Sequence, residues 1–264
     1  MEPSPPSSGT LFTLGLLGSV GASFGTALGA LPVLAVRRIS ARAQDVLQSV
    51  AAGIMLAATV FSLVLPGIAA AEARVGAALP ATLIVTGGIV LGSLAVHLVH
   101  RHAPHVHFQG APEGPPSRRL GQMWLFVVAI TLHNFPEGMA VGVGFGGGVA
   151  SGTTLGLAIF IQNLPEGFLV ALGLASVGYR RGRAVLVSCA TGLVETVGGL
   201  VGASAVAVAA AALPWTMGFA AGAMLFVISH EIVPETHRNG YEVEATFGLV
   251  GGFALMLLMN AALG

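Results

Sequence analysis

Residues 120–145 read LGQMWLFVVAITLHNFPEGMAVGVGF, an apolar run with a single acid, Glu137, well inside it. A helix that crosses a bilayer needs about 20 predominantly apolar residues, so this run is long enough to span. Seven further runs of the same kind leave little of the 264 residues outside them. We therefore predict eight membrane-spanning helices over residues 11–36, 47–71, 77–100, 120–145, 152–177, 184–211, 214–236 and 243–263.

The composition agrees with this prediction. Hydrophobic residues make up 55% of the chain and charged residues 8%, with a mean hydropathy of +0.87, whereas soluble domains carry about 25% charged residues. The formal net charge is zero, so charge gives no support for nucleic-acid binding. The single cysteine, Cys189, excludes an intramolecular disulfide. We expect an all-α, polytopic membrane protein with one transmembrane domain over residues 1–264.

Arginine positions predict the orientation in the membrane. All 11 basic residues are arginines, and all but Arg74 fall at the ends of the first, third, fifth and seventh spans. Because cytoplasmic loops collect basic residues, both termini are expected outside. The loop at 101–119 is then cytoplasmic, and its surroundings hold His100, His102, His105 and His107. Such a tract either binds metal loosely or is a plain linker.

Two copies of one polar motif interrupt consecutive spans. Residues 133–138 read HNFPEG and residues 162–167 read QNLPEG, 29 residues apart. In each copy the first polar residue and the glutamate are four apart, so they share one helix face. Each proline removes a backbone donor, so we expect a kink whose freed carbonyl faces a cavity.

Five carboxylates lie in the predicted spans, at Glu137, Glu166, Glu195, Glu231 and Glu235, and no Arg lies deep in any span. Each costs roughly 2.5–3.5 kcal/mol at a helix centre. A bound cation, protons or water in a cavity must therefore compensate them. The spacing favours a cation, because the two motifs and Glu195 lie midway along three helices. Imidazole with carboxylate and amide oxygens suits Zn²⁺ and its neighbours.

The candidate metal ligands are His133, Asn134, Glu137, Gln162, Asn163, Glu166 and Glu195, with Met55 as a soft ligand or as ordinary core packing. His230 and Glu231 lie nearer the cytoplasmic end of the seventh span, so we expect them along a metal exit pathway. Glu235 and His237 are either part of that pathway or a solvated interfacial face.

The motif pair, Glu195 and the stretch SHEIVPETHRNG at 229–240 resemble the ZIP (Zrt/Irt-like) family of metal transporters, closest to its bacterial GufA-like branch. The resemblance covers essentially the whole chain. It implies a 3+2+3 arrangement of eight helices with inverted repeats, a homodimer in the bacterial inner membrane, and import of Zn²⁺, with Cd²⁺, Fe²⁺ and Mn²⁺ as further ions, by alternating access.

The resemblance also implies a two-metal site. Met55, His133, Glu137, Gln162 and Glu166 would form one position, and Asn134 and Asn163 with Glu137, Glu166 and Glu195 the other. The chain departs from the family pattern at Gln162, where many members have His, and at Asn163, where some have Asp. Binding of two ions at once therefore stays open.

The sequence also allows two other functions to be considered. An intramembrane metalloprotease would need a second histidine at position 234 after His230-Glu231, but that residue is proline, so we do not expect an enzyme. A carrier in which protons neutralise the carboxylates is the other alternative. His133 argues against a pure proton wire, although protons must compete with metal for these ligands.

Overall fold

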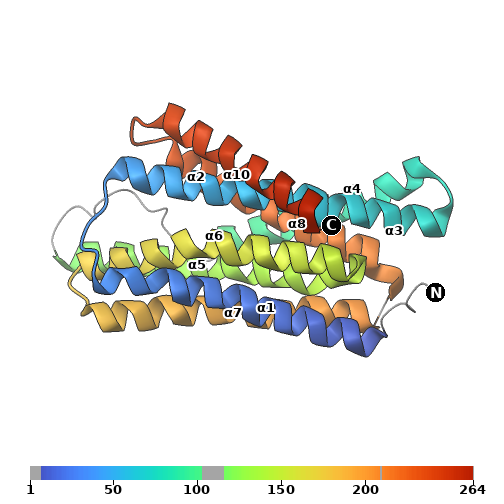
Figure 1. The fold of residues 1–264 in the computed structure, drawn as a ribbon, viewed down its shortest axis with the longest axis horizontal. Coiled ribbons are helices and arrows are strands. Elements are labelled where there is room, and N and C mark those ends of the chain that lie inside the picture. The colour runs from blue at the N-terminus through green and yellow to red at the C-terminus, as the bar shows by residue number, and fades with distance from the viewer. Residues whose placement is uncertain (1–6, 103–115, 209, 264) are drawn as a thin grey trace.

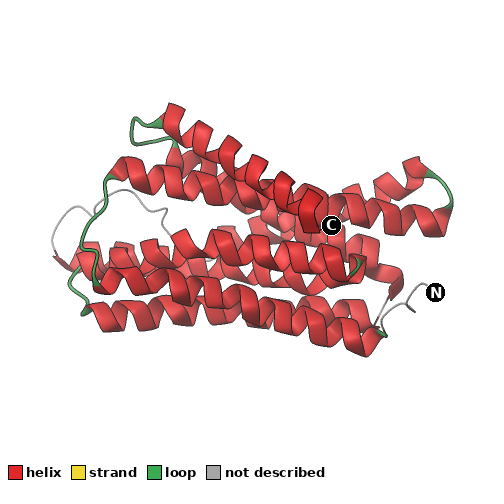
Figure 2. Ribbon diagram, viewed as in Figure 1, coloured by secondary structure: helices red, strands yellow, loops and turns green. Residues whose placement is uncertain are grey.

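The computed structural model describes residues 7–102, 116–208 and 210–263, and within these ranges it is helical apart from short turns (Figure 2). No strand occurs in them, and eight of their helical segments are long and apolar enough to cross a membrane, which confirms the predicted fold class. The bounds of the segments are Ser8–Leu34, Ala41–Val75, Ala78–His102, Met123–Gly147, Val149–Ser176, Arg181–Val208, Leu213–Thr236 and Glu242–Leu263.

Some of these spans are composite, and the others are single helices. The elements are α1 (Ser8–Ala30) with the 3₁₀ turn Leu31–Leu34; α2 (Ala41–Ala58) and α3 (Leu65–Val75), joined by the π-helical segment Thr59–Val64; α4 (Ala78–His102); α5 (Pro116–Gly144); α6 (Val149–Ser176); α7 (Arg181–Val208); α8 (Leu213–Val227) and α9 (Val233–Thr236), joined by the π-helical segment Ile228–Ile232; and α10 (Glu242–Leu263).

The second span starts earlier than its hydropathy predicts, at Ala41 rather than residue 47. Its first turns are polar, but their charges have partners on or near the last span. Arg42 pairs with Glu244 at 3.1 Å, and buried Asp45 accepts a hydrogen bond from Asn239 at 2.9 Å. The third span likewise extends to His102, which is helical rather than part of the loop. His105 and His107 lie outside the described residues.

The helices form two groups that lie against each other (Figure 1). In one group, α1 packs on α6 and α7, and α5 packs on α7. In the other, α2 pairs with α10, and α4 pairs with α8. The groups meet where α2 contacts α6 and where α5 contacts α8. The two motif-bearing helices, α5 and α6, therefore face the second group across this boundary.

The pairing pattern has an internal symmetry. Exchanging the first three spans with the last three, and α5 with α6, reproduces the main helix contacts. Because spans alternate in direction, the two halves related in this way run oppositely. The π-helical segments also correspond, since each is followed directly by a helix with proline in its first turn, Pro66 or Pro234. This pattern supports the inverted repeat that the sequence resemblance implies.

Glycines allow backbone contact within the first group. A Cβ on Gly29 of α1 would lie 2.0 Å from the carbonyl oxygen of Leu164, and one on Gly167 of α6 would lie 2.0 Å from that of Thr26. In lipid the burial of apolar side chains does not drive helices together, so close packing at small residues stabilises their association. Gly21, one turn before Gly25 on α1, does not take part in this close packing, because a Cβ added to it would have no atom within 4 Å.

Candidate metal site

The turn between α5 and α6 sets the depth of the two motifs. It consists of the 3₁₀ turn Phe145–Gly147 and Gly148, whose φ of 126° lies in a region that favours glycine. The helices are therefore antiparallel neighbours, and motifs 29 residues apart meet at one level. Both helices continue without a break through their motif prolines, Pro136 and Pro165.

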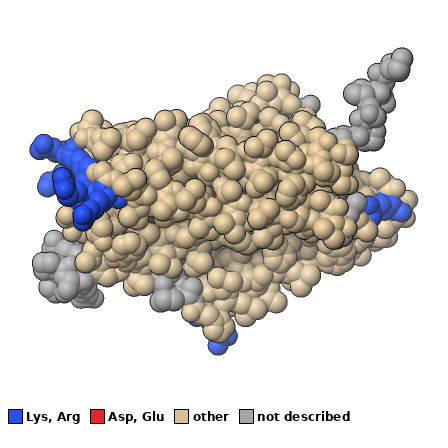
Figure 3. Space-filling model, turned by 90° about the horizontal axis from the view of Figure 1, so that it is seen from below, with Lys and Arg blue, Asp and Glu red and all other residues tan. Residues whose placement is uncertain are grey.

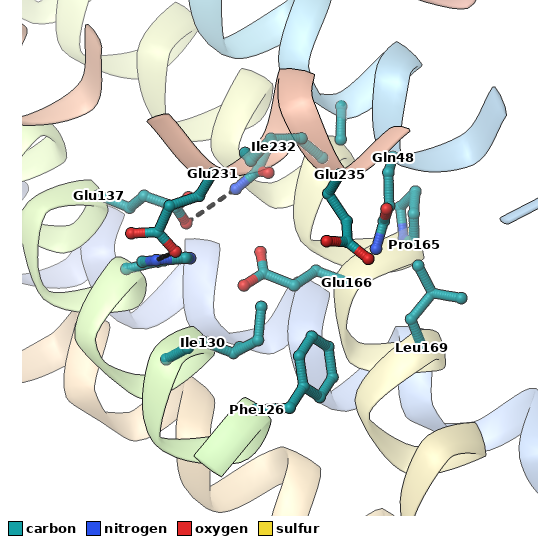
Figure 4. A pocket seen from close by; sticks show the side chains of 14 residues that line it. Gln48, Phe126, Ile130, Glu137, Pro165, Glu166, Leu169, Glu231, Ile232 and Glu235 are labelled. Carbon is teal, nitrogen blue, oxygen red and sulfur yellow. Dashed lines mark hydrogen bonds and ion pairs between the residues drawn. The ribbon is translucent and has the colours of Figure 1, made fainter. Parts of the chain in front are cut away.

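A pocket opens between the two helix groups at this level (Figure 4). Figure 4 shows the carboxylates of Glu137, Glu166, Glu231 and Glu235 directed into one space. The pocket is lined by residues of α2, α5, α6 and the composite seventh span, namely Gln48, Ala51, Phe126, Ala129, Ile130, His133, Glu137, Gln162, Pro165, Glu166, Leu169, Glu231, Ile232 and Glu235. Four of the predicted ligands line the side of the pocket that α5 and α6 form, which we call the pocket wall: His133, Glu137, Gln162 and Glu166.

Two of the predicted acidic ligands lie in a nearly dry environment. Glu137 is 2% exposed and Glu195 is fully buried, whereas Glu166 is only partly buried where it lines the pocket. In the described ranges, no Arg pairs with any of these three carboxylates. Burying such charges without a partner costs several kcal/mol per ion. The arrangement therefore favours a cation in the pocket.

Amides link two of the carboxylates. Gln162 Nε2 donates to Glu137 Oε2 at 2.8 Å and to Asn163 Oδ1 at 2.5 Å. Asn163 Nδ2 in turn donates to Glu195 Oε1 at 2.7 Å and to the carbonyl oxygen of Ala22 at 3.1 Å. The neighbouring residues Gln162 and Asn163 therefore join Glu137 on α5 to Glu195 on α7 and to the backbone of α1.

Glu231 is closer to the motif helices than its place in the sequence predicts. Its Oε2 pairs with His133 Nε2, and its Oε1 pairs with His100 Nδ1 of α4 at 2.9 Å. Glu231 therefore lines the same pocket as the motif residues and does not lie in a separate binding site nearer the cytoplasm. His230 is exposed and does not line the pocket, and its ring lies 5.2 Å from that of His100. Glu231 joins the two helix groups through His133.

The remaining predicted ligands do not line the pocket. Met55 is 1% exposed in the apolar core. Asn134, Asn163 and Glu195 are fully buried outside the pocket lining. Neither side-chain polar atom of Asn134 has a hydrogen-bond partner in the described part of the chain.

Acidic and imidazole groups alone do not complete a coordination shell in this arrangement. Across residues 7–102, 116–208 and 210–263, no three His, Cys, Asp or Glu side chains are grouped so that they could hold an ion. A cation bound here therefore needs amide or water oxygens as well. Gln162 lines the pocket, and since its NH₂ group donates to Glu137 and Asn163, its amide oxygen is a ready source.

Sequence reasoning missed the contributions of Gln48 and His100. Gln48 lines the pocket from α2, and His100 contacts Glu231 from α4. Gln48 carries no charge and lies near a predicted helix start, so no intramembrane charge signals it. The sequence groups His100 with a His-rich loop, and only the packing of α4 against α8 shows that it faces inward.

Eight apolar helices with acids, imidazole and amides around one pocket have the features of a membrane protein that handles cations. Residues 97–260 match the family model described as ZIP Zinc transporter. The chain is 50% identical over 250 residues to "Zinc transporter ZIPB" of Bordetella bronchiseptica, covering 94% of this chain and 81% of that one. It is 43% identical over 251 residues to "Zinc transporter GufA" of Myxococcus xanthus, covering 95% and 99%.

A more distant relative is "Zinc transporter ZIP11" of Homo sapiens, 36% identical over 175 residues, 59% of this chain and 51% of that one. The chain belongs to the ZIP family of zinc transporters. It is a multi-pass membrane protein that transports metal ions, with Zn²⁺ as substrate, and it is not an enzyme. In bacteria such a protein lies in the inner membrane.

Proposed function

We propose that this chain imports Zn²⁺ into the cytoplasm by binding it in the pocket between the two helix groups, against the side formed by α5 and α6. The observation that carries the proposal is the convergence of His133, Glu137, Gln162 and Glu166 on one wall, where the acids have no arginine partner in the described ranges. Imidazole nitrogen and carboxylate oxygen are ordinary zinc ligands. Met55, which lies in the core outside the pocket lining, is proposed as a soft fifth ligand that would reach the ion by turning its side chain toward the pocket.

The orientation of the chain in the membrane is argued from charge. Arg37 and Arg38 lie between the first two spans, and Arg180, Arg181 and Arg183 lie at the α6–α7 turn. In Figure 3, the largest group of arginine atoms lies at one end of the visible face, smaller groups lie at the opposite end and at the lower edge, and the broad middle of that face, as far as it is described, shows almost no charged atoms. The positive-inside rule then puts this end in the cytoplasm and both termini outside. Charge fixes the orientation but not the direction of transport, so entry of zinc from the opposite end is proposed from the family resemblance.

Alternating access is proposed to use the two helix groups. The pocket lies at their boundary, with ligands from α5 and α6 on one side and Glu231 on the other. Sliding of the first group would carry the bound ion relative to Glu231, which already contacts His133. Glu231 and His230 would then pass the ion toward the cytoplasm, where the loop at 101–119 would receive it.

The same oxygen and nitrogen ligands suit other transition metals, so Cd²⁺, Fe²⁺ and Mn²⁺ are proposed as further ions. We also propose a homodimer as the working assembly. Both statements extend the family resemblance, and competition uptake and the mass of the purified protein in detergent test them.

Substitution of Glu166 tests the site. In proteoliposomes, Glu166→Ala should abolish zinc uptake while the amount and the monodispersity of the protein stay normal, because the variant loses a ligand on the pocket wall. The control is Glu72→Ala, at an exposed acid on α3 outside the pocket. Uptake by Glu166→Ala at the control rate would refute the assignment.

A further inference from the structure

Arginines gather at one end of the first helix group, far from the ion pocket. Two segments that are distant in sequence supply them, the chain just after the first span and the turn between α6 and α7, and both lie at the same end of the bundle (Figure 1). The largest group of arginine atoms in Figure 3 lies at that end. Four of the side chains are exposed and one is partly buried. We call these five residues the arginine rim: Arg37, Arg38, Arg180, Arg181 and Arg183.

The two segments of the rim are held together by the fold. Arg181 Nη1 donates to the carbonyl oxygen of Leu34 at 2.7 Å, which ties the start of α7 to the end of the first span. Beneath this bond, fully buried Val33 and Val185 of α7 belong to one apolar cluster, and Ile39 packs against it. The backbone of the rim is therefore in place before any ligand binds, which lowers the ordering cost of binding.

The charge of the rim is not neutralised within the described part of the chain. The described acids on α1, α5, α6 and α7 are only Glu137, Glu166 and Glu195, which lie midway along their helices. None of the ion pairs between described residues includes an arginine of the rim. Like charges brought this close repel one another, so the rim favours an anion from outside the chain.

The positive-inside rule explains the sign of the rim but not its lack of partners. Arg42 and Arg238 lie at the same end of the bundle, on the second helix group, and obey the same rule. Arg42 nevertheless pairs with Glu244 at 3.1 Å, and Arg238 lies 3.8 Å from Glu235. Acids thus accompany these two arginines of the second group, whereas the rim of the first group has none in the described ranges.

An aromatic pair marks the depth of the rim in the membrane. Trp124 Nε1 donates to the hydroxyl oxygen of Tyr179 at 2.9 Å, and the two rings meet edge to face at 6.2 Å. Tyr179 directly precedes Arg180 in the α6–α7 turn. Tryptophan and tyrosine are enriched at the membrane–water interface, where their rings lie at the level of the lipid head groups. The rim therefore lies where lipid phosphates are concentrated.

We propose that the arginine rim binds the head-group phosphate of anionic glycerophospholipids. The guanidinium group binds phosphate oxygens through two parallel hydrogen bonds, and all 11 basic residues of the chain are arginines. Clusters of about four to eight basic residues next to a membrane-spanning helix bind anionic lipids. A lipid of the surrounding bilayer thus supplies the negative charge that the first helix group lacks at this end. The site lies outside the ion pocket and does not depend on the function proposed for it.

The test measures lipid binding to the purified full-length chain by native mass spectrometry in a neutral detergent. Phosphatidylglycerol is titrated against phosphatidylcholine, which has no net charge. We expect phosphatidylglycerol to bind at least about tenfold more tightly, since each arginine near an anionic surface contributes about fivefold. Equal binding of the two lipids by the wild type would overturn the proposal.

Matched double variants assign the binding to the rim. Each removes two positive charges at the same end of the bundle, and the loss expected in the rim is at least about tenfold in phosphatidylglycerol affinity. Each half of the rim is tested separately, so one variant suffices if the other does not fold. The rim variants are Arg37→Gln with Arg38→Gln and Arg180→Gln with Arg183→Gln, and the control is Arg42→Gln with Arg238→Gln. Wild-type affinity in a folded rim variant, or an equal loss in the control, would overturn the assignment.

Two further arms identify the source of the phosphate. Raising the salt concentration to about 0.5 M should weaken phosphatidylglycerol binding, because salt screens exposed charges, and binding that ignores salt would contradict an ionic contact. Inorganic phosphate at the concentration of the lipid should leave phosphatidylglycerol bound, since the lipid also has its acyl chains in the micelle. Displacement by inorganic phosphate at that concentration would assign the rim to a free anion and overturn the lipid proposal.

Discussion

The glycine of the HNFPEG motif offers a sharp test of how the fold supports the site. A Cβ on Gly138 would lie 1.8 Å from the backbone oxygen of Glu195 and 2.4 Å from its carbonyl carbon. Since ordinary contact begins at 3.4 Å, α5 and α7 would have to separate by the difference, about 1.6 Å. Overpacking costs about 1–3 kcal/mol, and a clash with backbone cannot be relieved by a side-chain rotation. For Gly138→Ala we therefore expect the upper end, about 3 kcal/mol.

The assay is thermal unfolding of the purified variants in detergent, followed by the loss of the monodisperse gel-filtration peak. A cost of about 3 kcal/mol in a chain of this size corresponds to a fall in Tm on the order of 10 °C. Gly167→Ala should fall similarly, because its Cβ would lie 2.0 Å from the Thr26 oxygen. Gly21→Ala is the matched control, with nothing within 4 Å, and should melt at or above wild type. If Gly138→Ala melted like the control but lost transport, the glycine would serve the ion site rather than helix packing.

Three further outcomes are expected. Glu231→Gln should reduce zinc uptake by about tenfold or more at normal protein level, because the charged partner of His133 and His100 is lost; uptake equal to wild type would remove Glu231 from the pathway. Asn239→Ala should lower the free energy of unfolding by about 1–3 kcal/mol, since buried Asp45 loses its hydrogen bond, and an unchanged melting curve would contradict this. Zinc affinity, measured by calorimetry, should fall as the pH falls, because protons compete for carboxylate and imidazole ligands, and a flat profile through mildly acidic pH would count against such ligation.

Much of the fold could be read from hydropathy. All eight spans occur, because a long apolar run has one stable solution in lipid, a helix. The shared level of the two motifs also follows from sequence, since a short turn forces antiparallel neighbours. Helix ends are predicted less accurately. Arg42 and Asp45 lower the hydropathy of the first turns of α2, yet both have partners on other segments.

What the sequence does not predict depends on contacts between distant segments. The π-helical segments before Pro66 and Pro234 change the local register of the second and seventh spans. Its position along the sequence of the seventh span therefore predicts that Glu231 lies on the cytoplasmic side of the metal site. In the structure Glu231 contacts His133 of that site. Similarly, the motif spacing does not reveal that Asn163 faces Ala22 and Glu195 rather than the pocket. Only the packed structure separates the pocket-lining ligands from Asn134, Asn163 and Glu195, which are fully buried outside the pocket lining.

The central claim is that a divalent cation compensates the acids between α5 and α6, and anomalous diffraction from crystals soaked in Cd²⁺ tests it most directly. We predict a strong anomalous peak in the pocket, beside the residues His133, Glu137, Gln162 and Glu166 that line it, with amide or water oxygens completing the coordination shell. Absence of cadmium between these two helices, in crystals that bind the ion elsewhere, would contradict the account.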